Sequence, residues 1–295
     1  MTDEAIQRVQ VGDIEIAYET FGRREDPPVL LVMGLATQMI GWPDEFCRQL
    51  ADRGHFVVRF DNRDIGLSTH LDAAGAPDVL AIMGGDVSSV AYGLPDLATD
   101  TVGLLDALGL DRVHLVGASM GGMVAQLVAV QAPERVRSLT SIMSTTGAPG
   151  VGAPADVAVP VLLAPAATDR EGAIQRVIDT YRVIGSPGFE FDEAALRDRA
   201  GLSFDRAHDP AGVARQLAAI LTTHDRTPDL AQLDVPTLVI HGSQDTLVDV
   251  SGGRATAAAI PGAELLVVDG MGHDLPREMW PEILDRISAL IARAG

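Results

Sequence analysis

The sequence predicts an α/β fold, in which an open, mainly parallel sheet of eight strands carries helices on both faces. Three observations support this prediction. Short apolar runs alternate with helical patterns over most of the chain. One of these runs ends in a glycine-rich turn with a serine at its tip. Strand patterns are absent between residues 147 and 232, where three helical patterns follow one another.

The chain opens with alternating apolar and polar residues from Ile6 to Ala17, which predicts an antiparallel hairpin that turns at Gly12. Later apolar runs are typical of buried parallel strands, and they lie at Val29–Met33, Phe56–Phe60, Val113–Val116, Val136–Met143, Val235–Ile240 and Leu265–Val268. Helical patterns lie at Asp44–Arg53, Leu97–Leu108, Met123–Ala129 and Trp280–Ala292. The segment from His70 to Gly93 shows little periodicity and is interpreted as a long loop.

The composition changes near Gly147, where Gly147–Pro154 has the glycine and proline content of a linker. Helical patterns follow near Glu171–Ile184, Asp192–Phe204 and Pro210–Thr222. We therefore predict a core formed by residues 1–146 and 233–295 and a helical cap formed by residues 147–232. The cap should cover the strand ends, where such sheets bind ligands, and the linker should let it move. The cap helices carry the apolar residues Ile174, Val177, Ile178, Leu217, Ile220 and Leu221. Most of these should pack the cap helices together and onto the core.

The glycine-rich turn reads Gly117-Ala-Ser119-Met-Gly121 and lies between a predicted strand and a predicted helix. This context is typical of a nucleophile elbow, which lifts a serine hydroxyl above the sheet. The two glycines should avoid a clash with the strained serine backbone. Other glycine-rich motifs fit poorly, because a phosphate-binding Walker loop needs a lysine and the chain has none. A dinucleotide fingerprint would need an acidic residue about 20 positions later, where the chain reads Leu139-Thr-Ser-Ile142.

Two further polar residues follow predicted strands at the same edge of the sheet. Asp245 lies just after Val235–Ile240, and His273 lies in a glycine-rich loop after Leu265–Val268. A neutral imidazole can take the proton of a serine hydroxyl, and a carboxylate can hold that imidazole in the correct tautomer. We predict that Ser119, Asp245 and His273 form such a triad. The alternatives for the acid are Asp249, Asp269 and Asp274.

The six remaining histidines are assigned structural or surface positions and no part in catalysis. His114 lies in a predicted strand and should be structural, and His241 should help to order the loop of Asp245. The others carry no motif and are interpreted as surface or cap residues; they are His55, His70, His208 and His224.

An oxyanion hole should come from the backbone N–H groups of Leu35 and Met120, beside the serine.

Five segments together resemble the α/β-hydrolase superfamily, and the resemblance covers nearly the whole chain. They are Val32–Leu35, Gly41–Phe46, Asp61–Ser68, Gly117–Gly122 and Gly270–His273. Among its subfamilies the chain is most similar to actinobacterial esterases of the aclacinomycin methylesterase type. This resemblance implies the α/β-hydrolase fold, the chain order Ser…Asp…His, a helical cap and hydrolysis of a carboxylic ester of medium to large, apolar character. The chain departs from many relatives at Val32-Met33-Gly34, where they carry His-Gly.

Other activities use the same three residues. A cofactor-free perhydrolase of the haloperoxidase type and a C–C bond hydrolase stay open as alternatives, and a ligand receptor without hydrolytic activity is an alternative of another class. Dehalogenases and epoxide hydrolases fit less well, because they resemble this chain except for an aspartate at the nucleophile position.

The composition limits the partners. The net charge of −19 argues against nucleic acid and anionic membranes as partners. No apolar run reaches the length of a membrane span, and the first residues do not resemble a signal peptide. One cysteine, Cys47, excludes a disulfide framework within the chain. We expect a cytoplasmic enzyme that acts on a small-molecule ester with no cofactor and no metal, and a homodimer is one candidate assembly.

Overall fold

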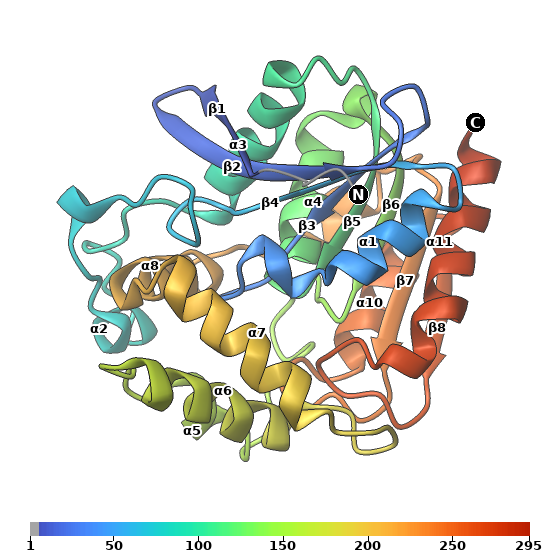
Figure 1. The fold of residues 1–295 in the computed structure, drawn as a ribbon. Helices are drawn as coiled ribbons and strands as arrows, with labels where there is room; N and C mark the ends of the chain where they lie inside the picture. Colours follow the sequence, from blue (N-terminus) through green and yellow to red (C-terminus); the bar gives the residue numbers. More distant parts are fainter. Residues whose placement is uncertain (1–5) are drawn as a thin grey trace.

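The computed structural model describes residues 6–295. Its centre is one sheet of eight strands in the order β1-β2-β4-β3-β5-β6-β7-β8. The first three strands of this order pair antiparallel, and every later pair is parallel. The predicted fold class and number of strands are therefore confirmed (Figure 1).

The elements alternate along most of the chain. The strands are β1 (Gln7–Val11), β2 (Ile14–Phe21), β3 (Pro28–Val32), β4 (Phe56–Phe60), β5 (Val113–Ala118), β6 (Val136–Ile142), β7 (Thr237–Gly242) and β8 (Glu264–Val268). The α-helices are α1 (Asp44–Ala51), α2 (Val79–Met83), α3 (Leu94–Ala107), α4 (Met120–Gln131), α5 (Val159–Leu162), α6 (Arg170–Ile184), α7 (Glu193–Arg206), α8 (Pro210–Leu221), α9 (Thr227–Leu230), α10 (Ser251–Ala259) and α11 (Trp280–Ala294).

Each face of the sheet has its own apolar core. Strand β3 shows why, because successive side chains of a strand point to opposite faces. Leu30 and Val32 join the core that contains residues of α3 and α4, whereas Val29 and Leu31 join the core that contains residues of α1 and α11. Cys47 on α1 is fully buried in the second core, as expected for a small structural residue. In the described part of the chain no helix is both long and apolar enough to cross a membrane.

Four helices, α2, α5, α9 and α10, were not predicted from the sequence, and α5 and α9 have only 4 residues each. Helix α10 reads Ser-Gly-Gly-Arg-Ala-Thr-Ala-Ala-Ala and contains no large apolar residue, so it has no visible amphipathic period. Helix α2 has only 5 residues and lies inside the segment that was interpreted as a long loop. Its Leu80 and Met83 side chains are exposed, so their apolar character does not mark a buried face.

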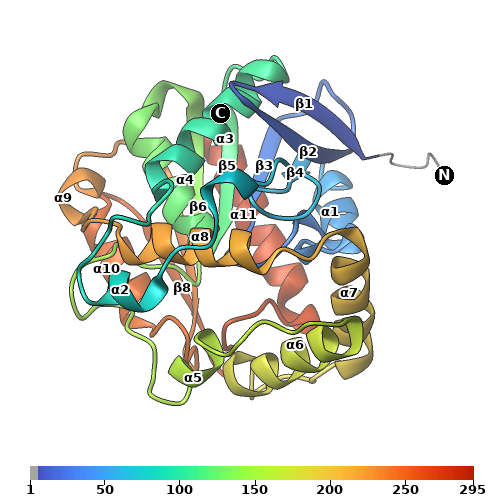
Figure 2. The same ribbon diagram turned by 90° about the vertical axis from the view of Figure 1, so that its left-hand side faces the viewer.

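The segment between β6 and β7 contains only helices, α5 to α9, which we call the insertion helices. Helices α6 and α7 pack on each other through a small core of their own, formed by Ile174, Ile178, Leu196 and Ala200. Both ribbon views place α6 farther from the sheet than α8 (Figures 1 and 2). The expectation that the apolar residues mostly pack these helices holds for Ile174 and Ile178, whereas Leu221 is 41% exposed.

Candidate active site

Ser119 occupies the sharp turn between β5 and α4. Its backbone has φ 56° and ψ −122°, a conformation that side-chain-bearing residues rarely adopt. Such a conformation costs on the order of 1–3 kcal/mol and persists only where its surroundings hold it. Part of that support is the Ser119 N–H, which donates to the carbonyl of Ile142 at 2.9 Å. The turn leaves the serine side chain partly exposed at the carboxyl end of β5.

The glycines around Ser119 allow the backbones to approach closely. A Cβ atom on Gly117 would lie 2.2 Å from the carbonyl oxygen of Gly121. A Cβ atom on Gly121 would lie 2.1 Å from the carbonyl oxygen of Val32. Both distances are shorter than any tolerated contact, so this turn requires glycine at both positions. The sequence analysis predicted this requirement, although it did not identify Val32 as the neighbour.

Three side chains from three loops form one hydrogen-bonded chain. His273 Nε2 lies 2.9 Å from Ser119 Oγ, and His273 Nδ1 lies 2.7 Å from Asp245 Oδ2. Since a carboxylate can only accept, Nδ1 carries the proton, and Nε2 is left to accept from the serine hydroxyl. The backbone N–H of His273 donates to the carbonyl of Ile184 at 2.7 Å, which fixes the loop below the ring. This arrangement can remove a proton from Ser119 and hold it on the imidazole.

The hydrogen bonds and charges around Asp245 keep its carboxylate ionised. Its Oδ1 atom accepts the backbone N–H groups of Leu247 and Val248, both at 2.9 Å, which leaves Oδ2 for His273. Burial alone would raise the pKa of Asp245, but the charge of His273 and hydrogen bonds from His241, His273 and the Val248 N–H lower it to about 2. The carboxylate is therefore charged at every pH at which an enzyme of this kind would work.

The other candidate carboxylates have different partners. Asp249 accepts the N–H of Ser251 at 2.9 Å, and Asp269 accepts the hydroxyl of Ser243 at 3.0 Å. Asp274 accepts the hydroxyl of Ser186. Of the four carboxylates considered, only Asp245 is hydrogen-bonded to His273.

Some of the remaining histidines lie where the sequence predicted them, and others do not. His114 is buried and bonds to Ser138 at 2.8 Å, and burial lowers its pKa to about 4, as a structural role requires. His241 Nε2 lies 2.7 Å from the carbonyl of Val248, so it does help to order the loop of Asp245. The interpretation of His55 as a surface or cap residue is wrong, because this residue is 5% exposed and contacts Ser288 on α11.

The loop after β3 lies against the serine. A Cβ atom on Gly34 would lie 3.0 Å from Ser119 Cβ, so Leu35, the next residue, is close to the elbow. Among residues 6–295, neither the Leu35 N–H nor the Met120 N–H donates to a protein acceptor. The side chain of Asn62 donates to the Met33 carbonyl at 3.0 Å and so supports this loop from below. Two free backbone donors beside a serine can stabilise an oxyanion.

The polar loop at Asp61–Ser68 anchors the insertion helices. Asp61 binds Arg206 of α7 at 2.7 Å, and Asp64 binds Arg215 of α8 at 2.7 Å. All four side chains are nearly or fully buried, so removal of one partner would leave an uncompensated charge. This function was not predicted from the sequence, since an arginine on a predicted helix is usually a solvated residue.

A cluster beside this anchor has the spacing of a metal site. The ligand atoms of Asp64, His70 and Asp209 lie within 4.8 Å of one another. However, Arg215 binds both carboxylates, and His70 Nδ1 lies 2.7 Å from Asp209. The cations of the chain already compensate these carboxylates, so the donor set fits an ion-pair network better than a metal. His70, which the sequence predicted to be a surface or cap residue, is therefore a partly exposed member of the anchor.

The insertion also contacts the loop of His273. Besides the bond from His273 to Ile184, the Gly188 N–H donates to the carbonyl of Gly270 at 2.9 Å. The Gly272 N–H donates to the hydroxyl of Ser186 at 2.9 Å. The end of α6 therefore supports the loop that carries the imidazole.

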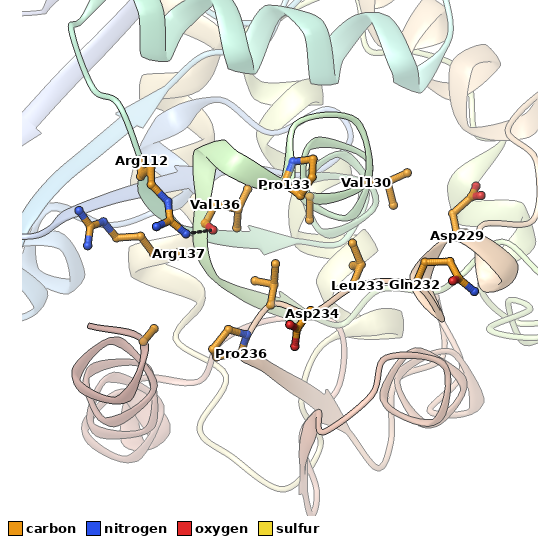
Figure 3. A pocket seen from close by; sticks show the side chains of 13 residues that line it. Arg112, Val130, Pro133, Val136, Arg137, Asp229, Gln232, Leu233, Asp234 and Pro236 are labelled. Carbon is orange, nitrogen blue, oxygen red and sulfur yellow. Dashed lines mark hydrogen bonds between the residues drawn. The ribbon is translucent and has the colours of Figure 1, made fainter.

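A surface cavity of about 450 Å³ lies at the opposite end of the sheet. Its lining includes Arg112, Val136 and Pro236, which precede or begin β5, β6 and β7 (Figure 3). Ser119, Asp245 and His273 follow the carboxyl ends of their strands, so this cavity is separate from the candidate active site.

Comparisons with known proteins agree with the geometry. A family profile described as "alpha/beta hydrolase fold" matches residues 27–180 and 185–276. The rhodomycin D methylesterase DauP of Streptomyces sp. (strain C5) is 32% identical, with 90% of this chain and 90% of that protein covered. The non-heme chloroperoxidase CPO-A1 of Kitasatospora aureofaciens is 28% identical, with 89% of this chain and 90% of that protein covered. The crystal structure of the esterase RhEst1 from Rhodococcus sp. ECU1013 superposes with a TM-score of 0.75 at 21% identity, over 98% of this chain and 99% of that one.

Proposed function

This chain belongs to the α/β-hydrolase fold family and is a carboxylic ester hydrolase, and from that premise we propose that Ser119, His273 and Asp245 are its catalytic triad. The observation that carries the proposal is the continuous hydrogen-bonded chain from Ser119 Oγ through His273 to Asp245. The test is turnover of a chromogenic ester by the Ser119→Ala variant, whose expected result is given in the Discussion.

The proposed reaction has two halves. Ser119 Oγ attacks the ester carbonyl while His273 Nε2 takes the hydroxyl proton, and the tetrahedral intermediate collapses as that proton passes to the leaving alcohol. A water molecule then attacks the acyl-enzyme, with His273 as base, and releases the acid. Asp245 keeps the imidazole in the required tautomer and stabilises its cation.

The oxyanion would lie between the N–H groups of Leu35 and Met120. Met120 is the first residue of α4, so its N–H belongs to the helix N-terminus, where the helix dipole adds partial positive charge. Both donors are backbone groups, which is why apolar side chains are compatible with this role.

Because both donors are backbone groups, two substitutions of Leu35 should have different outcomes. Leu35→Ala keeps the N–H and should change kcat by no more than a few-fold. Leu35→Pro removes the N–H and should lower kcat on the order of 10²-fold or more. The measurement is kcat for both variants with one ester, after circular dichroism has shown that each is folded. A folded proline variant with nearly normal kcat would mean that Leu35 is not a donor.

We propose that residues 147–232 form a cap over the serine and that the substrate is a medium or large apolar ester. The name of the Streptomyces relative describes a methylesterase acting on rhodomycin D, so a methyl ester of a bulky molecule is our first candidate. The anchors on Asp61, Asp64 and the His273 loop favour a cap that stays seated on the core. Movement through the Gly147–Pro154 linker stays a prediction.

The substrate proposal predicts a dependence on acyl chain length. Contacts with a roofed apolar site can help to position the reacting carbonyl, so p-nitrophenyl esters of medium chain length should have a higher kcat/KM than the acetate. A steady fall in kcat/KM from the acetate upward would instead indicate a small cavity, and the bulky-substrate proposal would then be dropped.

Assays on the same enzyme preparation can distinguish the alternative activities. The chloroperoxidase relative favours a test for perhydrolase activity, in which hydrogen peroxide replaces water on the acyl-enzyme. A C–C bond hydrolase would cleave a carbon–carbon bond with the same three residues, and a receptor would turn over no ester. The cytoplasmic location and the homodimer stay predictions.

A further inference from the structure

The side chain of Gln216 joins helix α8 to the loop that follows β3. It is fully buried. Its Oε1 atom accepts the backbone N–H of Ala36 at 3.2 Å, and its Nε2 atom donates to the carbonyl of Arg63 at 2.9 Å. Both contacts are with backbone groups of the core, and Ala36 directly follows the proposed oxyanion donor Leu35. Gln216 therefore reaches from the cap into the catalytic loop.

The loop itself is a tight turn in a strained conformation. The Thr37 N–H donates to the Gly34 carbonyl at 3.3 Å, which closes a four-residue turn with Leu35 and Ala36 at its centre. Ala36 has φ 58°, and Leu35 is not among the residues with positive φ. This combination is typical of a type II turn, whose third position is usually glycine. An L-residue with a side chain is strained in this region.

The Leu35–Ala36 peptide is held at both ends. The hydroxyl of Thr37 donates to the Leu35 carbonyl at 3.1 Å, and Gln216 accepts the Ala36 N–H. Without Gln216 the Ala36 N–H would lose this acceptor, and a flip of the Leu35–Ala36 peptide would return Ala36 to a negative φ. The strain therefore favours a second conformation of the turn, and the hydrogen bond to Gln216 opposes it.

We propose that Gln216 is a positioning residue of the oxyanion hole, which holds the turn at Leu35–Ala36 so that the Leu35 N–H points at the reacting carbonyl oxygen. The Leu35 N–H belongs to the Gly34–Leu35 peptide, next to the peptide that Gln216 holds. A turn that is free to rearrange therefore keeps this donor in the catalytic direction for only part of the time, and the rate falls with that fraction. Helix α8 thus completes the catalytic site and does more than cover it. This inference rests on the proposed function of Leu35 as an oxyanion donor.

A purely structural role for Gln216 makes a different prediction. The buried pairs Arg206–Asp61 and Arg215–Asp64 already hold α7 and α8 on the core. Gln126 supplies a matched control, because it is also a fully buried glutamine that bonds across to the insertion. Its Oε1 atom accepts from Arg226 at 3.1 Å and its Nε2 atom donates to Ser141 at 3.3 Å, without a contact to the Leu35 loop.

The experiment compares Gln216→Met with Gln126→Met. Methionine keeps the length of the side chain and removes both hydrogen bonds. For each variant we would measure kcat and KM with one ester, the inhibition constant of an alkyl trifluoromethyl ketone, and Tm. This ketone forms a hemiketal with the serine, and its oxyanion mimics the one in the transition state.

Gln216→Met should lower kcat about tenfold, within the limit of 10²–10³-fold for the loss of a whole oxyanion donor. KM should change little, and the inhibition constant should rise by the same factor as kcat/KM falls. Gln126→Met should leave kcat and the inhibition constant within about twofold of the wild type, whatever its effect on Tm. The inference is overturned if Gln216→Met leaves both quantities unchanged, or if the two variants lose activity equally.

A second variant keeps the test decisive if Gln216→Met does not fold. Burial favours the neutral acid of a glutamate, and that acid offers the same acceptor and donor as the amide. Gln216→Glu should therefore retain most of the wild-type kcat, and a folded glutamate variant with kcat a hundredfold below the wild type would contradict the inference. A wild-type enzyme that the ketone does not inhibit would instead count against the proposed serine mechanism, so the two failures are distinguishable.

Discussion

Replacement of Ser119 by alanine should lower kcat on the order of 10⁶-fold, which is the scale found when a serine nucleophile is removed from a triad. The substitution removes Oγ and keeps Cβ, so the strained turn between β5 and α4 should survive. Because Gly117 and Gly121 still permit the close approach of the backbones, the variant should fold and bind ester with nearly unchanged affinity. The measurement is kcat with a chromogenic ester in a preparation free of other esterases.

The control for Ser119→Ala depends on the three triad residues acting as one catalytic unit. His273→Ala should produce a loss of similar size, and the double variant should lose little more than either single variant, since residues that act as one unit are not additive. A Ser119→Ala variant with kcat within tenfold of the wild type would contradict the assignment.

Replacement of Asp245 by asparagine should lower kcat by about 10⁴-fold, the effect known for the same change in a serine protease. The reason follows from the two oxygens of Asp245. Oδ1 accepts two N–H groups, from Leu247 and Val248, so the single oxygen of an asparagine would stay there. The amide NH₂ would then face His273 Nδ1 and donate to it. That tautomer carries its proton on Nε2 and cannot accept the hydroxyl proton of Ser119.

The matched control is Asp249→Asn. Asp249 lies in the same loop, and it accepts the N–H of Ser251, where α10 begins. Its replacement should cost some stability, since a helix end loses a charged acceptor, and it should change kcat by no more than a few-fold. If Asp249→Asn were the more damaging change, the assignment of the acid would be wrong.

Much of the candidate site was predictable because its signals are local. A strand, a Gly-x-Ser-x-Gly turn and a helix place Ser119 at the edge of the sheet in one stretch of sequence. Asp245 and His273 each follow an apolar run directly, and the carboxyl ends of parallel strands meet at one edge. The sequence could therefore propose Ser119, Asp245 and His273 as a set, although it left four carboxylates open. Only the structure pairs His273 with Asp245.

The contacts between the insertion and the core were not predictable, because they depend on partners far apart in the sequence. Arg215 and Asp64 are separated by 151 positions, and Gln216 and Ala36 by 180. In the sequence both Arg215 and Gln216 resemble ordinary polar residues of an amphipathic helix. Helix α10 was missed for a different reason, since small residues leave no periodic pattern.

The most direct test of the central claim is covalent labelling with a fluorophosphonate. The reagent needs a serine whose proton a neighbouring base removes, and its adduct places the phosphoryl oxygen in the oxyanion hole. We expect loss of activity at a stoichiometry of one label per chain, with the adduct on Ser119 when the labelled protein is digested and sequenced by mass spectrometry. Inactivation with stoichiometric label on another serine, and with Ser119 unmodified, would contradict it.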